Sequence, residues 1–190
     1  MRGVGVVLYM VILSGALKNK KIPYCGKIKL VVRPTLSLLR KALFGILGSN
    51  LVGTICLDLF CGTGSLGFEA ISRGALFVYF VDNSPLALKS VRRFITVNSL
   101  TNALVLPYCC SYFLASCFIT FDYIFIDAPY SSFLCIFDIL FTCYGLLRPC
   151  GVLYFENFRS LKSINFEFWG FNLYQFGVKG RVYFYLLERK

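Results

Sequence analysis

A glycine-rich turn between an apolar stretch and an amphipathic stretch constrains this chain more than any other feature. Apolar residues 54–57 predict a buried strand that leads into Asp58, and Gly62, Gly64 and Gly67 follow at GxGxxG spacing. Glycines let the backbone approach a ligand closely, and the start of the following helix offers unpaired N–H groups. This order is typical of a cofactor site. Taken alone, the stretch is also compatible with a purely structural strand-to-helix turn.

The stretches around this turn alternate between apolar and amphipathic runs, which predicts an α/β, Rossmann-like fold. We expect a seven-stranded, mostly parallel sheet with helices on both faces, closed by an antiparallel C-terminal hairpin. The expected strands are residues 54–59, 77–81, 103–106, 121–126, 152–155, 171–176 and 182–187. The expected helices are residues 36–47 with Thr35 as the cap, 65–73, 86–98, 111–117 and 133–146.

The chain is expected to form one domain, because 190 residues are enough for a single sizeable core. Residues 1–9 are expected to be a dispensable extension, since Met10 opens an apolar segment with strand character. Residues 10–32 predict a small basic β-hairpin or arm, in which apolar segments 11–13 and 28–32 flank a group of lysines.

Charge and cysteine content narrow the classes of function. The net charge of +11, from 20 basic and 9 acidic residues, fits a polyanionic partner, with a merely solvated surface as the alternative. Nine cysteines without CxxC spacing and without any histidine argue against a zinc site. They fit free thiols in a reducing compartment, so we expect a cytoplasmic protein. The uncharged stretch 104–121 is explained by strand, loop and helix without a membrane span.

Three of the nine acids, Asp58, Asp82 and Asp127, lie at the carboxyl ends of predicted strands. Because these ends meet at one edge of a parallel sheet, the three acids are expected to share one site. The carboxylate of Asp58 would not stabilise a negatively charged pyrophosphate. It would attract the positively charged ammonium and sulfonium of S-adenosylmethionine. Asp82 can accept hydrogen bonds from ribose hydroxyls in either cofactor class, so an NAD-binding domain stays an alternative.

The motif Asp127-Ala128-Pro129-Tyr130 discriminates further. It resembles the Asp/Asn-Pro-Pro-Tyr/Phe motif of methyltransferases that act on exocyclic amines of bases. The Asp127 carboxylate and the Ala128 carbonyl can accept both N–H bonds of such an amine and stabilise the positive charge that grows on it. Pro129 stiffens the turn, and Tyr130 offers a face for stacking an extruded base. An ordinary Asp-x-Pro turn is the alternative for this stretch alone.

Several stretches in one order resemble the bacterial ribosomal RNA small subunit methyltransferase D family. They are residues 10–15, 33–44, 58–70, 72–75 and 121–130. The resemblance implies a class I methyltransferase fold, S-adenosylmethionine as methyl donor and a guanine N2 amine in small-subunit ribosomal RNA as acceptor. It also implies a monomer that acts on this RNA or an assembling 30S particle, with no metal and no membrane.

The site residues that follow from motif and resemblance fall into three groups. For catalysis they are Asp127, Ala128, Pro129 and Tyr130. For the cofactor they are Asp58, Phe60, Gly62, Thr63, Gly64, Ser65, Gly67, Asp82 and Asn83. For RNA they are Lys18, Lys20, Lys21, Arg33 and Arg40, although Arg33 could equally be a structural ion-pair partner.

The chain departs from the family pattern at two places. Ala128 stands where the family has proline, and the segment after residues 103–106 lacks the acid that family members place near the adenine amine. Ser111 or backbone groups are expected to substitute for that acid. These departures keep a non-catalytic RNA-binding assembly factor open as an alternative. An adenine-N6 DNA methyltransferase is the other, although 190 residues leave little room for target recognition.

Overall fold

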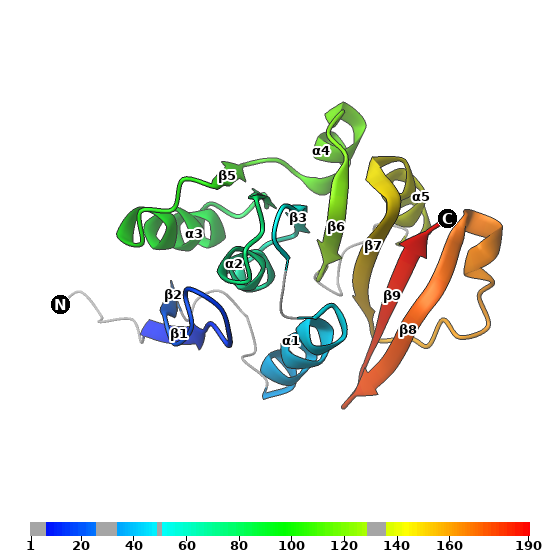
Figure 1. Cartoon of the computed structure of the whole chain (residues 1–190), viewed down its shortest axis with the longest axis horizontal. Coiled ribbons are helices and arrows are strands. Elements are labelled where there is room, and N and C mark those ends of the chain that lie inside the picture. Colours follow the sequence, from blue (N-terminus) through cyan, green and yellow to red (C-terminus); the bar gives the residue numbers. More distant parts are fainter. Residues whose placement is uncertain (1–6, 26–33, 49–50, 129–135) are drawn as a thin grey trace.

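A seven-stranded sheet forms the centre of the computed structural model, which describes residues 7–25, 34–48, 51–128 and 136–190 (Figure 1). The strand order is β5-β4-β3-β6-β7-β9-β8, with parallel pairs from β5 to β7 and antiparallel pairs on both sides of β9. The strands are β3 (Ile55–Leu59), β4 (Phe77–Val81), β5 (Ala103–Leu106), β6 (Phe121–Ile126), β7 (Leu147–Asn157), β8 (Phe171–Lys179) and β9 (Val182–Arg189). The predicted fold class is confirmed.

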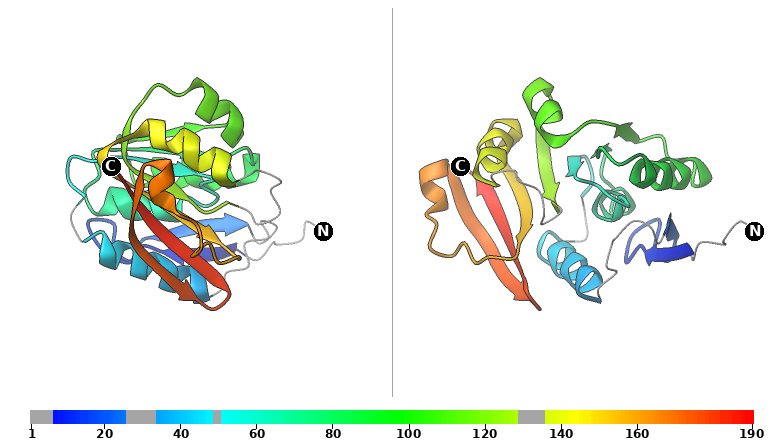
Figure 2. Two further views of the ribbon diagram at one scale, coloured as in Figure 1. Left: turned by 90° about the vertical axis from the view of Figure 1, so that its right-hand side faces the viewer. Right: turned by 180° about the vertical axis from the view of Figure 1, so that it is seen from behind.

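Two apolar clusters form the core, one on each face of the sheet, and Figure 2 shows the helices that cover the two faces. The first lies under α1 (Pro34–Ile46), α2 (Ser65–Ser72), α3 (Pro85–Val97) and an N-terminal hairpin. The second lies under α4 (Cys110–Ser116), α5 (Ile136–Leu146) and the short 3-10 helix η1 (Phe166–Trp169). Helices on both faces explain why the inner strands are apolar at nearly every position.

The N-terminal hairpin, residues 7–25, consists of β1 (Val7–Val11) and β2 (Lys21–Cys25). The predicted hairpin is confirmed, but its strands differ, because the lysine-rich turn is followed at once by β2. The segment 28–32 lies outside the described residues. Since β1 begins at Val7, it includes the last three residues of the predicted extension 1–9. That residues 1–9 are dispensable stays a prediction.

Most element bounds agree with the sequence prediction within a few residues. Helix α1 begins at Pro34, so Thr35 lies inside the first turn and is not the cap, consistent with the preference of proline for the first helical position. Strand β7 is longer than predicted at both ends, because Leu147 already pairs with Phe121 of β6 and β9 extends the pairing to Asn157. Helix η1 was not predicted, and the first residues of predicted helix 133–146 lie outside the described ranges.

Within the described residues, no helix combines the length and the apolar composition needed to cross a membrane.

Candidate active site

The glycine-rich turn leaves the carboxyl end of β3 with an unusual backbone. Phe60 has φ +63°, Gly62 has φ +52° and Gly64 has φ +77°, so three of five consecutive residues adopt the left-handed conformation. The Cys61 N–H donates to the Val81 carbonyl of β4 at 2.9 Å and thereby fixes the start of the turn. Phe60 is the one of these three residues that is not glycine, and a residue with a β-carbon is disfavoured in the left-handed conformation.

Two glycines of the turn serve different purposes. A β-carbon on Gly67 would lie 2.3 Å from the Phe80 ring, so this glycine lets α2 pack closely on β4. A β-carbon on Gly62 would meet nothing nearer than the Phe60 carbonyl oxygen at 3.9 Å. The backbone at Gly62 therefore faces open space, as expected where a ligand approaches the chain.

Asp58 and Asp82 hold this turn from two strands. The Gly67 N–H, in the first turn of α2, donates to Asp58 Oδ2 at 2.8 Å. The Gly62 N–H donates to Asp82 Oδ2 at 2.8 Å, and the Ser84 N–H donates to Asp82 Oδ1 at 2.7 Å. Two donors occupy about half of the acceptor sites of a carboxylate, so Asp82 keeps acceptor capacity for a further hydroxyl.

Asp127 joins the other two acids from the end of β6. Asp58 lies opposite Phe125 in the β3–β6 register, so Asp127 follows the strand end on the same edge. Burial raises the pKa of Asp58 well above its usual range, against the Gly67 hydrogen bond, and the charges of Asp127 and Asp82 raise it further. Burial also raises the pKa of Asp127 to about 6. Asp58 is therefore close enough to both other acids for their charges to act on it.

No ion pair from a described residue neutralises these three carboxylates. A group of acids that is buried or half-buried and lacks a countercharge is unfavourable unless a cation or a set of hydrogen-bond donors approaches it. The arrangement thus favours a positively charged ligand with hydroxyl groups over an anionic one.

The remaining predicted cofactor and catalytic residues that the structure describes are next to these acids in the chain. Phe60 and Ser65 are partly exposed within the turn and at the start of α2, and Asn83 is exposed between Asp82 and Ser84. Ala128 is partly exposed directly after Asp127, whereas Pro129 and Tyr130 lie outside the described residues. The roles of all these residues stay predictions.

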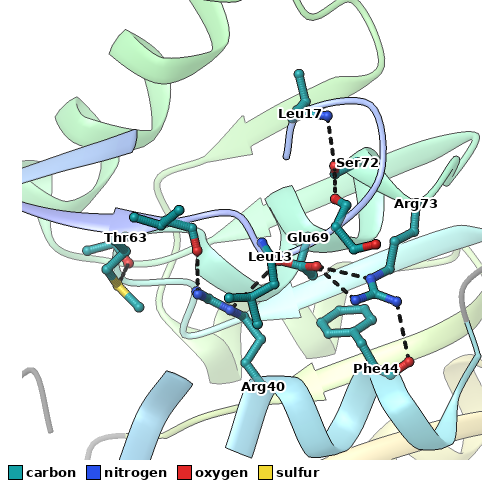
Figure 3. A network of polar contacts seen from close by, with 12 residues as sticks. Leu13, Leu17, Arg40, Phe44, Thr63, Glu69, Ser72 and Arg73 are labelled. Carbon is teal, nitrogen blue, oxygen red and sulfur yellow. Dashed lines mark hydrogen bonds and ion pairs between the residues drawn. The ribbon is translucent and has the colours of Figure 1, made fainter. Parts of the chain in front are cut away.

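Thr63 has a different surrounding. Its side chain is buried, and its hydroxyl donates to the Met10 sulfur of β1 at 3.1 Å (Figure 3). Thr63 therefore attaches the turn to the N-terminal hairpin, and its hydroxyl is already used within the protein. A backbone contact to a cofactor stays open to it.

The predicted RNA residues separate into two groups. Lys18, Lys20 and Lys21 are exposed on the N-terminal hairpin, and Arg33 lies outside the described ranges. Arg40 is only 3% exposed, and its Nη2 donates to the Val11 carbonyl at 2.6 Å. The prediction that Arg40 contacts RNA is wrong, because its guanidinium is enclosed between α1, β1 and α2.

A buried polar cluster around Glu69 was missed by sequence reasoning (Figure 3). Glu69 is fully buried in α2; its Oε1 lies 3.0 Å from both Nε and Nη2 of Arg73, and its Oε2 lies 3.8 Å from Arg40 Nε. The Leu13 N–H donates to the same Oε2 at 2.8 Å. An acid inside an otherwise apolar helix was the available signal for this cluster.

The end of α2 completes the attachment of the N-terminal hairpin. Ser72 Oγ donates to the Ser14 carbonyl and accepts from the Leu17 N–H at 2.9 Å, while the Ala16 N–H donates to the Ser72 carbonyl at 2.7 Å. A β-carbon on Gly15 would lie only 1.7 Å from that carbonyl oxygen. The turn after β1 therefore fits against α2 only with glycine at this position.

The segment after β5 carries no acid. Cys109 and Ser111 are both exposed, and their side chains lie 3.6 Å apart at the start of α4. Substitution of Ser111 or backbone groups for the missing acid stays a prediction. Among the described residues, no group of three or more acids or cysteines has the arrangement of a metal site.

Comparisons with known proteins agree with this geometry. The family model described as Conserved hypothetical protein 95 matches residues 10–186. The ribosomal RNA small subunit methyltransferase D of Buchnera aphidicola subsp. Baizongia pistaciae is 33% identical over 122 residues, which cover 64% of this chain and 61% of that protein. The protein of the same name in Escherichia coli K12 is 29% identical over 63% of this chain and 59% of the relative. The matches thus span about three-fifths of these curated relatives.

Solved structures share the fold along almost the whole chain. The Escherichia coli protein yhhF superposes with a TM-score of 0.81 at 24% identity, covering 96% of this chain and 99% of that one. The 16S rRNA N2 G1207 methyltransferase of Thermus thermophilus, in complex with AdoMet and guanosine, gives a TM-score of 0.71 at 21% identity. That match covers 97% of this chain and 50% of the other. Because the family model matches nearly the whole of this chain, the chain belongs to the Conserved hypothetical protein 95 family, the family of the ribosomal RNA small subunit methyltransferase D proteins.

Proposed function

We propose that this protein transfers a methyl group from S-adenosylmethionine to the N2 amine of a guanine in small-subunit ribosomal RNA. The observation that carries the proposal is the meeting of Asp58, Asp82 and Asp127 at one sheet edge without a countercharge among the described residues. Members of the family that carry the methyltransferase D name support the reaction and the RNA substrate. The cytoplasm and an assembling 30S particle are the setting we infer for it.

The residues at the rim fit S-adenosylmethionine. Asp58 offers a buried carboxyl group, and the positive charge of the ammonium or sulfonium favours the ionised form that burial disfavours, while Asp82 has acceptor capacity left for ribose hydroxyls. Gly62 presents bare backbone to the ligand because nothing would lie within 3.9 Å of a β-carbon there. When bound, S-adenosylmethionine supplies an electrophilic methyl group on a positively charged sulfur.

Asp127 and Ala128 act on the acceptor amine. A guanine N2 amine is a poor nucleophile, because its lone pair is delocalised into the ring. The Asp127 carboxylate and the Ala128 carbonyl accept hydrogen bonds from its two N–H groups, which favours a pyramidal nitrogen with its lone pair directed at the methyl group and stabilises the positive charge that develops on nitrogen. With a pKa of about 6, Asp127 is ionised at neutral pH and is placed to take up the proton that the amine releases.

Orientation supplies most of the remaining rate. The methyl group moves in one direct displacement, so the chain must hold donor and acceptor in line. Strands β3 and β6 are parallel neighbours, with Leu59 opposite Ile126, and they present Asp58 and Asp127 from a rigid sheet. Tyr130 is proposed to stack on the extruded base.

The replacement Asp127→Ala tests the proposal. We expect methyl transfer to small-subunit ribosomal RNA to fall by a factor of about 10² to 10³ or more, because both the acceptor and the charge are lost. Calorimetry should still detect S-adenosylmethionine binding. Asp138→Ala is the control, since this acid is exposed on α5 and should not affect the rate.

The product should be identified by mass mapping of the RNA with and without the protein. A methylated guanine in the RNA supports the proposal, and methylated adenine in DNA would replace it with the DNA methyltransferase. Absence of S-adenosylmethionine binding by the intact protein would favour the non-catalytic assembly factor. Full activity of the Asp127 variant would refute the role of that residue.

A further inference from the structure

The outer face of α3 carries cations that the proposed reaction does not use. Lys89, Arg92 and Arg93 are all exposed, and their i, i+3, i+4 spacing places them on one side of the helix. Helix α3 contains no acidic residue, and within the described ranges none of these three cations forms an ion pair. The opposite side of α3 is buried in the core through Ala87, Leu88, Val91 and Phe94.

The N-terminal hairpin lies against this helix and has the same sign of charge. Strand β2 contacts α3, and both elements contribute side chains to the same core cluster. The two lie side by side at the β5 end of the molecule, away from β8 and β9 (Figures 1 and 2). Residues 7–25 contain no acid. We call the exposed cations of both elements the basic flank: Lys18, Lys20, Lys21, Lys89, Arg92 and Arg93.

An aromatic side chain lies within this surface. Tyr9 is 52% exposed on the outer side of the hairpin, opposite to the side on which Met10 and Ile22 are buried. The Lys21 ammonium lies 5.8 Å from the centre of the Tyr9 ring. An exposed ring beside a lysine suits single-stranded nucleic acid, because the ring stacks on a base while the cation contacts a phosphate.

We propose that the basic flank and Tyr9 bind the phosphodiester backbone and an unpaired base of the RNA substrate, away from the nucleotide that is methylated. The inference rests on the proposed function, which makes RNA the substrate. The basic flank holds six of the 20 basic residues of a chain with net charge +11, and none of the six forms an ion pair with a described residue, so this surface matches a polyanion. The N-terminal hairpin is also attached to the glycine-rich turn through Thr63 and Met10, so RNA held here lies on an element fixed to the site.

The salt dependence of RNA binding tests the inference. In the triple variant Lys89→Ala, Arg92→Ala, Arg93→Ala, the slope of log affinity against log salt for a small-subunit ribosomal RNA transcript should decrease by about 2, the sum for three lost single-strand phosphate contacts. At moderate ionic strength we expect about 10- to 100-fold weaker binding. Tyr9→Ala should weaken binding about 5-fold or more at an unchanged slope, whereas Tyr9→Phe should retain it.

The matched control removes three exposed cations from the other end of the sheet. The variant Arg159→Ala, Lys179→Ala, Arg181→Ala has the same change of net charge and should keep both slope and affinity. S-adenosylmethionine binding, measured by calorimetry, should be unchanged in both triple variants and shows that they are folded.

Several outcomes overturn the inference. Equal losses in both triple variants would mean that net charge alone acts, and an unchanged slope in the α3 variant would exclude the basic flank. Loss of binding to phosphatidylserine vesicles, with RNA binding intact, would assign the surface to a membrane. If the α3 variant loses RNA affinity as expected but the intact protein methylates no RNA, the proposed function fails, while RNA binding by the basic flank stands.

Discussion

The buried acid Glu69 in α2 and the group of Asp58, Asp82 and Asp127 at the sheet edge differ in whether the protein supplies a countercharge. Glu69 forms ion pairs with Arg73 and Arg40 and accepts a hydrogen bond from the Leu13 N–H, so its charge is balanced inside the protein. Asp58 is 2% exposed, accepts one backbone N–H, and has two further carboxylates beside it. A balanced acid holds a structure together, whereas an unbalanced group of acids is costly unless something else binds it.

The largest effect should come from unbalancing the Glu69 cluster. Glu69→Gln leaves two buried guanidinium groups without their carboxylate, and we expect the free energy of unfolding to fall by about 3–5 kcal/mol. Urea denaturation measures this loss. Glu167→Gln is the control, because its ion pair with Lys190 at 3.4 Å is exposed and should be worth less than about 1 kcal/mol. Equal losses would show that Glu69 is no more structural than a surface acid.

The reverse experiment neutralises the unbalanced group. Asp58→Asn keeps an acceptor for the Gly67 N–H but removes the charge, so we expect S-adenosylmethionine to bind about 10- to 100-fold more weakly. Asp122→Asn is the matched control on the same pair of strands. Asp122 bonds the Ile55 N–H and Arg148 at the opposite end of β3, and its replacement should leave cofactor affinity unchanged. Calorimetry that finds the same affinity in both variants would contradict the comparison.

Removing a second charge at the rim should stabilise the fold. The folded-state pKa of Asp127 is raised to about 6, so between pH about 4 and 6 the folded protein binds more protons than the unfolded chain. Wild-type stability, measured relative to Asp127→Asn, should therefore fall as the pH rises through this window and stay constant above it. At pH 7 we expect the variant to be more stable by about 1–2 kcal/mol. Thermal unfolding across pH would detect it, and a variant less stable at pH 7 would contradict the sign.

The smallest effect concerns the bond between the glycine-rich turn and the N-terminal hairpin. Thr63→Val removes the hydroxyl that donates to the Met10 sulfur and keeps the shape of the side chain, so we expect a loss of about 1 kcal/mol or less. Thr63→Ser keeps the hydroxyl and should lose less. A melting temperature that is lower for the serine variant than for the valine variant would mean that packing, and not this bond, matters.

The rim of the sheet was predictable because its signals are local. Each of Asp58, Asp82 and Asp127 follows an apolar run, and the rule that parallel strands end at one edge brings them together. Their shared electrostatics follows from that placement. The strand order was not predicted, because the chain crosses from β5 at the sheet edge past β4 and β3 to β6, and no local pattern in the sequence marks this step.

The Glu69 cluster was not predictable in the same way, because two of its three partners, Leu13 and Arg40, come from distant stretches of sequence. The family resemblance implied that Arg40 contacts RNA, and only the packing of α1 on α2 shows that it is enclosed. The start of β1 at Val7 was also not predictable from local sequence. Its pairing with Cys25 across the lysine-rich turn leaves no periodic signal in so short a strand.

The position of α2 has a mechanical consequence. The helix begins at the glycine-rich turn that faces the proposed methyl donor. It ends at Ser72, which forms hydrogen bonds with Ser14, Ala16 and Leu17 of the N-terminal hairpin. Eight helical residues make a stiff rod about 12 Å long. One short helix therefore sets the spacing between the hairpin and the glycine-rich turn. The element proposed to hold RNA and the loop proposed to hold the cofactor are thus attached to opposite ends of the same helix.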